Sequence, residues 1–207
     1  MISPDIKNII FDLGGVIIDI NPAASFTAMQ ALAAKSVFVL DQFSEHAEVF
    51  LDYEKGLIDD DQFREGIRAL TQRPDLPASV IDEAWCRMLL HVPEPRLHLL
   101  AALHQRYRTF VLSNTNSIHV TAFNQLVATV SQHDTIEPFF EKVYYSHELN
   151  MRKPDAEIYQ YVLSDSTLLP RETLFLDDRV ENLAAAGAFG IRTQQVTPEQ
   201  GITNLFS

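Results

Sequence analysis

The sequence predicts an α/β protein built on a parallel sheet, with a helical segment inserted after the first strand. Short apolar runs of strand length alternate with longer stretches of helical periodicity, which is the pattern of βαβ units. Several of these runs end directly in polar residues, as strands do at the carboxyl edge of a parallel sheet. Between the first run and the second, residues 22–91 show only helical patterns. Together these observations predict three layers, with helices on both faces of the sheet.

The first predicted strand, Ile9–Phe11, organises the rest of the chain. It is apolar and continuous, it ends in Asp12, and Gly14 and Gly15 then allow a sharp turn and a close approach to a ligand. Because a carboxylate is costly to bury without a partner, we expect Asp12 at the ligand-binding edge of the sheet. Four further strands are expected at Thr109–Leu112, Lys142–Tyr145, Thr173–Leu176 and Arg192–Val196.

Helices are expected both in the insert and between the strands. The acids at Asp59–Asp61 favour a helix start, and Pro93 and Pro95 close the insert. We expect insert helices at Ala23–Lys35, Leu40–Tyr53 (with Phe43 on its apolar face), Asp59–Thr71 and Ala78–Leu90, with no strand among them. Between the strands we expect helices at Arg96–Tyr107, Ile118–Thr129, Asp155–Leu163 and Val180–Phe189.

The composition is typical of a globular protein with a substantial core. The chain has 207 residues, of which 46% are hydrophobic, enough for one large domain or a domain with an insertion. Its single cysteine, Cys86, cannot form a disulfide within the chain. With no visible secretion signal or transmembrane run, we expect a cytoplasmic protein. The formal net charge of −12 argues against nucleic acid and membrane partners, and we expect a monomer or a homodimer.

Polar residues follow three of the predicted strands, at the edge where those strands end together. Asp12 follows the first strand, Ser113 and Asn114 follow the second, and Asp177 and Asp178 follow the fourth. Oxygen ligands with no histidine or cysteine nearby in the sequence suit a hard cation, and Mg²⁺ is the expected metal.

A positive charge, Lys153, reaches the same edge from a loop just before a helix. Ser113, the Asn114 backbone and the start of the following helix offer donors for phosphate oxygens. Such a set stabilises charge on a transferring phosphoryl group, and Asp12 is placed to act as a nucleophile as well as a metal ligand.

Four motifs occur in order along the chain. They are F-D-L-G-G-V from Phe11, L-S-N-T-N from Leu112, R-K-P-D from Arg152 and F-L-D-D-R-V-E-N from Phe175. In these motifs the chain resembles the haloacid dehalogenase-like (HAD) hydrolases, in the subfamily with a helical cap after the first strand. The stretches around S-N-T-N and N-M-R-K-P-D are similar to the bacterial glucose-1-phosphate phosphatase branch.

The resemblance implies a Rossmann-like core of residues 1–21 and 92–207 with a helical cap of residues 22–91. It also implies that Asp12 is the nucleophile, forming an aspartyl-phosphate, and that Lys153 neutralises the nucleophile and the phosphate. Asp12, the Gly14 backbone carbonyl and Asp178 would hold Mg²⁺.

The remaining roles also follow from the resemblance. Ser113 and Asn114 would hold the phosphate, while Asp177 and Asn182 would support the metal site. The expected activity is that of a Mg²⁺-dependent phosphatase acting on a small phosphorylated metabolite, such as the sugar phosphate glucose 1-phosphate.

One position departs from the family pattern. Most phosphatases of this family have a second aspartate two residues after the nucleophile as general acid/base, and here that position is Gly14. A general acid contributes roughly 10²- to 10⁴-fold in rate, so a slow enzyme is expected. Asp19 or Glu54 are the candidates to replace it.

Two other functions remain open. Because Gly14 removes the usual acid, the chain can be a phospho-ligand binding or regulatory protein that has lost turnover. A 2-haloacid dehalogenase would share the aspartate nucleophile but need no Mg²⁺, and the metal-type Asp178 together with Lys153 argues against it.

Several residues also have a simpler structural interpretation. Ser113 and Asn114 can cap the next helix, Lys153 can be a solvated loop residue, and Asp177 or Asp178 can form an exposed ion pair with Arg179. In the insert, Glu54 and Asp59–Asp61 are expected on a solvated face and at a helix start. His119 is expected either to contact substrate or to support a helix start, and Cys86 to pack in the insert.

Overall fold

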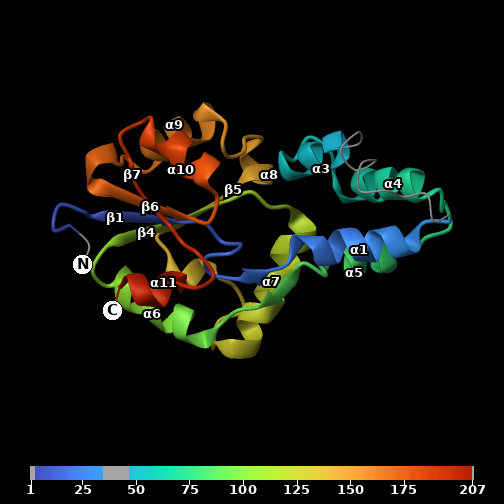
Figure 1. Ribbon diagram of the computed structural model, residues 1–207, viewed down its shortest axis with the longest axis horizontal. Helices are drawn as coiled ribbons and strands as arrows, with labels where there is room; N and C mark the ends of the chain where they lie inside the picture. Colours follow the sequence, from blue (N-terminus) through green and yellow to red (C-terminus); the bar gives the residue numbers. More distant parts are fainter. Residues whose placement is uncertain (1–2, 35–46, 207) are drawn as a thin grey trace.

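The computed structural model describes residues 3–34 and 47–206, and it contains a five-stranded, wholly parallel sheet (Figure 1). The strand order is β5-β4-β1-β6-β7, so β1 is central. The strands are β1 Asn8–Phe11, β4 Arg108–Ser113, β5 Lys142–Tyr145, β6 Thr173–Asp177 and β7 Arg192–Gln195. The predicted α/β class with a parallel sheet is confirmed.

Helices cover both faces of this sheet. Because successive side chains of a strand point to opposite faces, Ile9 and Phe11 pack in one apolar core and Ile10 packs in the other. The first core is closed by α6 (Glu94–His104), α7 (Ser117–Val130) and α11 (Gly201–Leu205), and the second by α9 (Ala156–Asp165) and α10 (Val180–Gly187). Shorter elements are η1 (Glu137–Phe139), α8 (Ser146–Leu149) and η2 (Pro170–Glu172).

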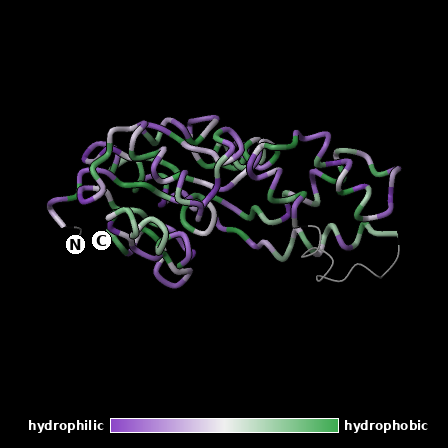
Figure 2. The backbone as a smooth tube through the Cα atoms, turned by 90° about the horizontal axis from the view of Figure 1, so that it is seen from above, coloured by the Kyte–Doolittle hydropathy of each residue, from purple (hydrophilic) through white to green (hydrophobic). Residues whose placement is uncertain are grey.

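A helical region forms one end of the molecule, beyond the carboxyl ends of the strands (Figure 2). It consists of α1 (Pro22–Leu32), α3 (Ala47–Glu54), α4 (Asp60–Thr71) and α5 (Ala78–Cys86). Phe63, Ile67 and Trp85 are buried in a core of its own, which Ile118 of α7 joins, and Cys86 packs against it. The exact division into a core of residues 1–21 and 92–207 and a cap of residues 22–91 stays a prediction.

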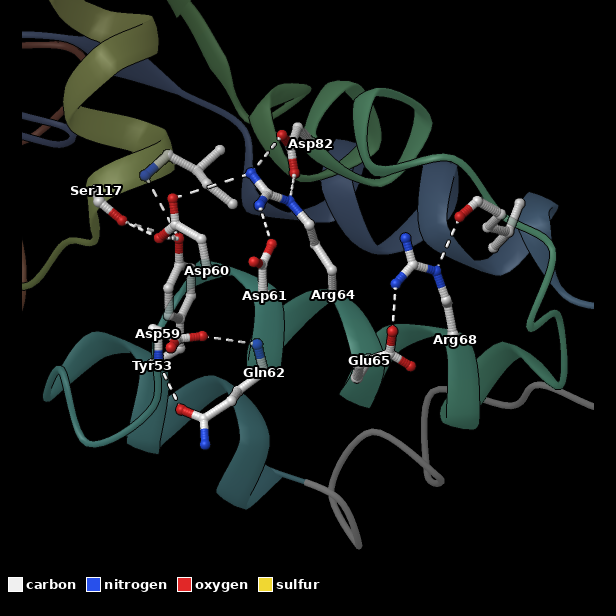
Figure 3. Close-up of polar contacts among 12 residues, drawn as sticks. Tyr53, Asp59, Asp60, Asp61, Gln62, Arg64, Glu65, Arg68, Asp82 and Ser117 are labelled. Atoms are coloured by element: carbon white, nitrogen blue, oxygen red, sulfur yellow. Dashed lines mark hydrogen bonds and ion pairs between the residues drawn. The ribbon is translucent and has the colours of Figure 1, made fainter.

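The start of α4 shows how the sequence specifies a helix in this region. Asp59 accepts a hydrogen bond from the Gln62 N–H, and the Gln62 side chain accepts one from the Asp59 N–H, both at 2.9 Å. Asp60 lies at the helix start, as expected, and its side chain is 40% exposed, but its carboxylate also accepts hydrogen bonds from Tyr53 and from Ser117 of α7 (Figure 3). Asp60 therefore links the helical region to the core.

The prediction that the insert contains no strand is wrong. β3 (Leu89–His91) pairs antiparallel with β2 (Asp19–Ile20), and the helix expected to reach Leu90 ends at Cys86. Apolar residues in so short a run fit either structure, and the pairing with β2 decides in favour of a strand. The helix at Leu40–Tyr53 is described only from Ala47, so its earlier positions, Phe43 included, and Lys35 lie outside the described residues.

No helix in the described ranges is long and apolar enough to cross a membrane.

Candidate active site

The carboxyl ends of three adjacent strands bring the predicted site together. β1 lies between β4 and β6, with Phe11 in register with Val111 and with Leu176. The next residue, Asp12, donates its backbone N–H to the Leu176 carbonyl at 2.8 Å, which extends the strand to the carboxylate itself. Asp12 is thus held at the sheet edge by strand pairing.

A buried lysine joins the two aspartates of this edge. The Lys153 Nζ lies 2.7 Å from Asp12 Oδ1 and 2.8 Å from Asp177 Oδ2. Lys153 and Asp177 are almost fully buried, at 1% and 0% exposure. The solvated-loop interpretation of Lys153 and the exposed ion-pair interpretation of Asp177 are both wrong.

Asn114 positions the backbone of that lysine. Its Oδ1 accepts the Lys153 N–H and its Nδ2 donates to the Lys153 carbonyl, both at 2.8 Å. The residue that caps α7 is instead Asn116, whose side chain accepts the His119 N–H at 3.0 Å. The interpretation of Ser113 and Asn114 as helix caps is therefore wrong. The cap is Asn116, which lies two residues after Asn114 and is also a residue type favoured at helix N-caps.

Burial and charge shift the pKa values of this group. Burial raises the pKa of Asp12 to about 7, against the opposing attraction of Lys153. Burial alone would lower the pKa of Lys153, but attraction to Asp12 and Asp177 outweighs it and raises the value. The pKa of Asp178 is also raised, by burial and by repulsion from Asp177. The three carboxylates of Asp12, Asp177 and Asp178 thus carry more negative charge than Lys153 alone can balance.

That excess charge fits a divalent cation. One carboxylate oxygen from each of Asp12, Asp177 and Asp178 lies within 4.8 Å of the others. Asp177 is already saturated, because it accepts hydrogen bonds from Lys153, from the Arg179 N–H and from the Asn182 side chain. Asp12 and Asp178 are therefore the carboxylates available to a cation, and oxygen donors of this kind suit Mg²⁺.

Gly15 makes room for Asp178. Its φ is +75°, and a Cβ built on it would lie only 2.7 Å from Asp178 Oδ2. No other residue type would leave the carboxylate in place beside the backbone of the turn. Asn182 closes the site on the other side, and its buried Oδ1 has no hydrogen-bond partner within the described ranges, as suits an oxygen in the surroundings of a hydrated cation.

These groups line a cavity of about 430 Å³ between the sheet edge and the helical region. Ser113 lies in the same lining and is 4% exposed. From the predicted site the cavity is lined by Asp12, Gly14, Ser113, Asn114, Lys153, Asp178 and Asn182, whereas Asp177 lies behind them. We call this strand-end part of the lining the floor. The structure thus brings together the residues that the sequence nominated, while their chemical roles stay predictions.

The opposite side of the cavity, which we call the wall, is built from contacts that the sequence did not predict. Trp85 of α5 stacks on His119 of α7 with ring centroids 4.7 Å apart, and the Trp85 carbonyl accepts from His119 Nε2 at 3.1 Å. Asn116 Nδ2 lies 3.3 Å from His119 Nδ1. Burial lowers the pKa of His119 to about 4, so the ring is neutral at pH 7. His119 therefore supports the wall and the helix start, and its ring N–H is engaged by the Trp85 carbonyl.

The two candidates for a replacement acid lie in different places. Asp19 is paired with Arg96 at 2.7 Å and with His91 at 3.2 Å. Glu54 lines the cavity and is not on an open solvated face. At Gly14 itself, a Cβ would lie 3.0 Å from Ile20 Cδ1, the tip of a flexible side chain.

The chain belongs to the haloacid dehalogenase-like hydrolases. The model of that family matches residues 6–190, which include all four motifs. The predicted family and hydrolase class are confirmed.

Within this family, the chain is similar to proteins named as phosphatases. It is 32% identical to a D-ribitol-5-phosphate phosphatase of Bacteroides thetaiotaomicron, covering 95% of this chain and 93% of that one. It is 28% identical to the sesquiterpene phosphatase astK of Aspergillus oryzae, covering 89% of this chain and 87% of that one. A solved HAD family enzyme of B. thetaiotaomicron, in complex with magnesium and inorganic phosphate, matches at 33% identity and a TM-score of 0.85, covering 98% of this chain and 100% of that one.

Proposed function

We propose that this protein is a Mg²⁺-dependent phosphatase that hydrolyses a phosphate monoester of a small metabolite. The observation that carries the proposal is the Asp12 carboxylate at the cavity floor, 2.7 Å from Lys153 and beside Asp178. The similarity to a D-ribitol-5-phosphate phosphatase and to a structure with magnesium and phosphate supports it. The substrate belongs to the sugar or sugar alcohol phosphates, of which glucose 1-phosphate is one example.

In the proposed reaction, an oxygen of Asp12 attacks the phosphorus and the bond from phosphorus to the leaving oxygen breaks. The leaving alkoxide takes a proton from a solvent water, and an aspartyl-phosphate is left on Asp12. Water then attacks the phosphorus, which releases inorganic phosphate and restores the carboxylate. Lys153 balances charge on Asp12 and the phosphoryl oxygens throughout.

The phosphate would be held mainly by the loop after β4. The Ser113 hydroxyl lines the cavity and makes no hydrogen bond with any described residue, so it can donate to a phosphate oxygen. The Asn114 side chain is occupied by Lys153, so this residue would contribute its backbone N–H. Asp12, the Gly14 carbonyl and Asp178 would hold Mg²⁺, which would offset the negative charge of the phosphate when bound.

The test is phosphate release from a panel of phosphorylated metabolites with Mg²⁺, with EDTA, and with Asp12→Asn as the blank. We expect metal-dependent release from a few sugar or sugar alcohol phosphates, and none from Asp12→Asn. Turnover retained by Asp12→Asn would refute the nucleophile assignment. Turnover of a haloacid that EDTA leaves unchanged would support the dehalogenase alternative.

The absence of an acid at position 14 favours one second function, a phospho-ligand binding or regulatory protein with impaired turnover. Gly14→Asp separates the two functions, because the three atoms nearest to the new Cβ all belong to the Ile20 side chain, and its tip, Cδ1, need move only slightly. A wild-type rate near the blank with a gain of roughly 10²-fold or more in Gly14→Asp would favour the binding function. Substantial wild-type turnover with little gain would favour the phosphatase.

A further inference from the structure

Glu54, the last residue of α3, brings a carboxylate from the helical region to the cavity lining. Its side chain is 27% exposed. Arg152 donates both of its hydrogen bonds to a single oxygen, Glu54 Oε2, with distances of 3.2 Å from Nε and 3.0 Å from Nη2. The other oxygen, Oε1, has no hydrogen-bond partner in the described part of the chain. One charged acceptor is therefore available to a ligand.

The backbone around Glu54 is fixed to the core. The Ser146 hydroxyl donates to the Glu54 carbonyl at 2.5 Å, and Asn150 Nδ2 donates to the Lys55 carbonyl at 2.9 Å. The Lys55 Nζ also lies 3.0 Å from Asp155 Oδ2. Because these contacts exist before a ligand binds, placing Glu54 against that ligand costs little ordering entropy.

The preceding residue, Tyr53, is fixed as well. Its hydroxyl donates to Asp60 Oδ1 at 2.8 Å, and the Ser117 hydroxyl donates to the same oxygen. Figure 3 shows Tyr53, Asp60 and Ser117 converging at the N-terminal end of α7. Glu54 is thus held between anchored neighbours.

The other charged or titratable groups in the cavity lining are already engaged. Asp12, Lys153 and Asp178 belong to the proposed reaction. Arg179 pairs with its neighbour Glu181, and both ring nitrogens of the neutral His119 have partners in the wall. Most of the remaining wall is apolar, with Phe26, Trp85 and Met88 among its residues. The part of a ligand beyond the phosphate therefore meets apolar surface and one carboxylate oxygen, Glu54 Oε1, that has no hydrogen-bond partner among the described residues.

We infer that Glu54 is a specificity-determining residue that selects phosphate esters of neutral polyhydroxy alcohols. The inference rests on the proposed phosphatase function and names the substrate class of the same cavity. A substrate hydroxyl donates a charge-assisted hydrogen bond to Glu54 Oε1. A leaving group with a carboxylate or a second phosphate is repelled by the same charge. Sugar and sugar alcohol monophosphates are accepted, and their acidic counterparts are disfavoured.

The experiment compares wild type with Glu54→Gln on three esters. D-ribitol 5-phosphate offers hydroxyls, D-ribonate 5-phosphate adds a carboxylate to the same carbon chain, and p-nitrophenyl phosphate has no hydroxyl on its leaving group. For Glu54→Gln we expect a KM for D-ribitol 5-phosphate raised roughly tenfold at similar kcat, since a charged hydrogen-bond acceptor becomes neutral. The discrimination against D-ribonate 5-phosphate should shrink, and p-nitrophenyl phosphate kinetics should not change.

Glu48→Gln is the matched control, because Glu48 is exposed in the first turn of the same helix. It should behave as wild type on all three esters. Arg152→Gln is a second variant that keeps Glu54 but removes its anchor, and it should raise the same KM. It keeps the inference testable if Glu54→Gln does not fold.

Other outcomes would overturn the inference. A lower kcat of Glu54→Gln on D-ribitol 5-phosphate, with unchanged KM and unchanged p-nitrophenyl phosphate turnover, would make Glu54 the proton donor to the leaving group. An equal loss on all three esters would make its role structural. If wild type hydrolyses none of the three with Mg²⁺, the proposed function itself fails. Wild-type turnover with no effect of either variant refutes only the assignment of Glu54.

Discussion

The floor and the wall of the cavity are held together in different ways. On the floor, Asp12, Lys153 and Asp177 are buried charges that stabilise one another across strand ends. The wall is held by the stacked rings of Trp85 and His119 and by partly exposed ion pairs between the helical region and the core. Removing one partner of a buried charge group costs far more than removing an exposed one.

In the proposed function, the floor would carry out phosphoryl transfer and the wall would select the substrate. The floor tolerates little change, because each of its charges compensates another that would otherwise be buried alone. In the proposed function, the wall would contact the part of a substrate that differs from one phosphate ester to the next. Substitutions in the wall can therefore alter the choice of substrate while the groups proposed for phosphoryl transfer stay in place.

The largest effect on stability is expected from Lys153→Met. Without the ammonium group, Asp12 and Asp177 remain buried and unpaired, so the free energy of unfolding should fall by about 3–5 kcal/mol. Denaturant unfolding in EDTA measures this without compensation by a metal. Lys142→Met is the control, because Lys142 pairs with Asp165 at the exposed end of β5 and should change stability little. Equal losses in both variants would contradict the contrast between buried and exposed charges.

A smaller, pH-dependent effect is expected in the wall. The pKa of His119 is about 4 in the fold against 6.5 for an ordinary histidine, so the unfolded chain binds the proton first as the pH falls. Burial of the neutral His119 ring therefore leaves the free energy of unfolding unreduced above pH 6.5. As the pH falls towards 4, this free energy decreases, and at pH 4.5 the decrease is about 2–3 kcal/mol. Unfolding measured from pH 7.5 to 4.5 should show a shallower decline for His119→Asn. His98→Asn, on an exposed helix surface, should keep the wild-type slope, and identical slopes for both variants would refute this account.

The smallest and most local effect, on Mg²⁺ binding at the cavity floor, is expected from Gly15→Ala. The new methyl group would displace the Asp178 carboxylate, and the positive φ adds backbone strain. We expect Mg²⁺ to bind roughly 10–100-fold more weakly, measured by metal-dependent thermal stabilisation. Gly187→Ala is the matched control, because nothing except its chain neighbours and the backbone of its own helix lies within 4 Å of its Cβ position, and it should bind Mg²⁺ normally. Normal Mg²⁺ binding by Gly15→Ala would argue against Asp178 as a ligand.

The sequence by itself determined the layers of the fold and most of the cavity floor. Apolar runs of strand length predicted four of the five strands, because a parallel strand buried on both faces must be largely apolar. The fifth, β7, lies at the sheet edge and is polar and mostly exposed. The polar residues after these runs necessarily meet, because parallel strands end at one edge. Asp12, Ser113 and Asp178 could therefore be placed in one site without knowledge of any side-chain contact.

Tertiary structure alone decided the wall and the finer roles. Helical periodicity shows that Trp85 faces inward, but it does not show that α5 packs against α7 and sets that ring on His119. The ion pair of Glu54 with Arg152 and the contact of Asp60 with Ser117 likewise join residues whose separation in the sequence carries no signal. The physical reason is that backbone hydrogen bonds align the ends of neighbouring strands. Contacts between helices depend instead on how the side chains of residues far apart in the sequence pack together.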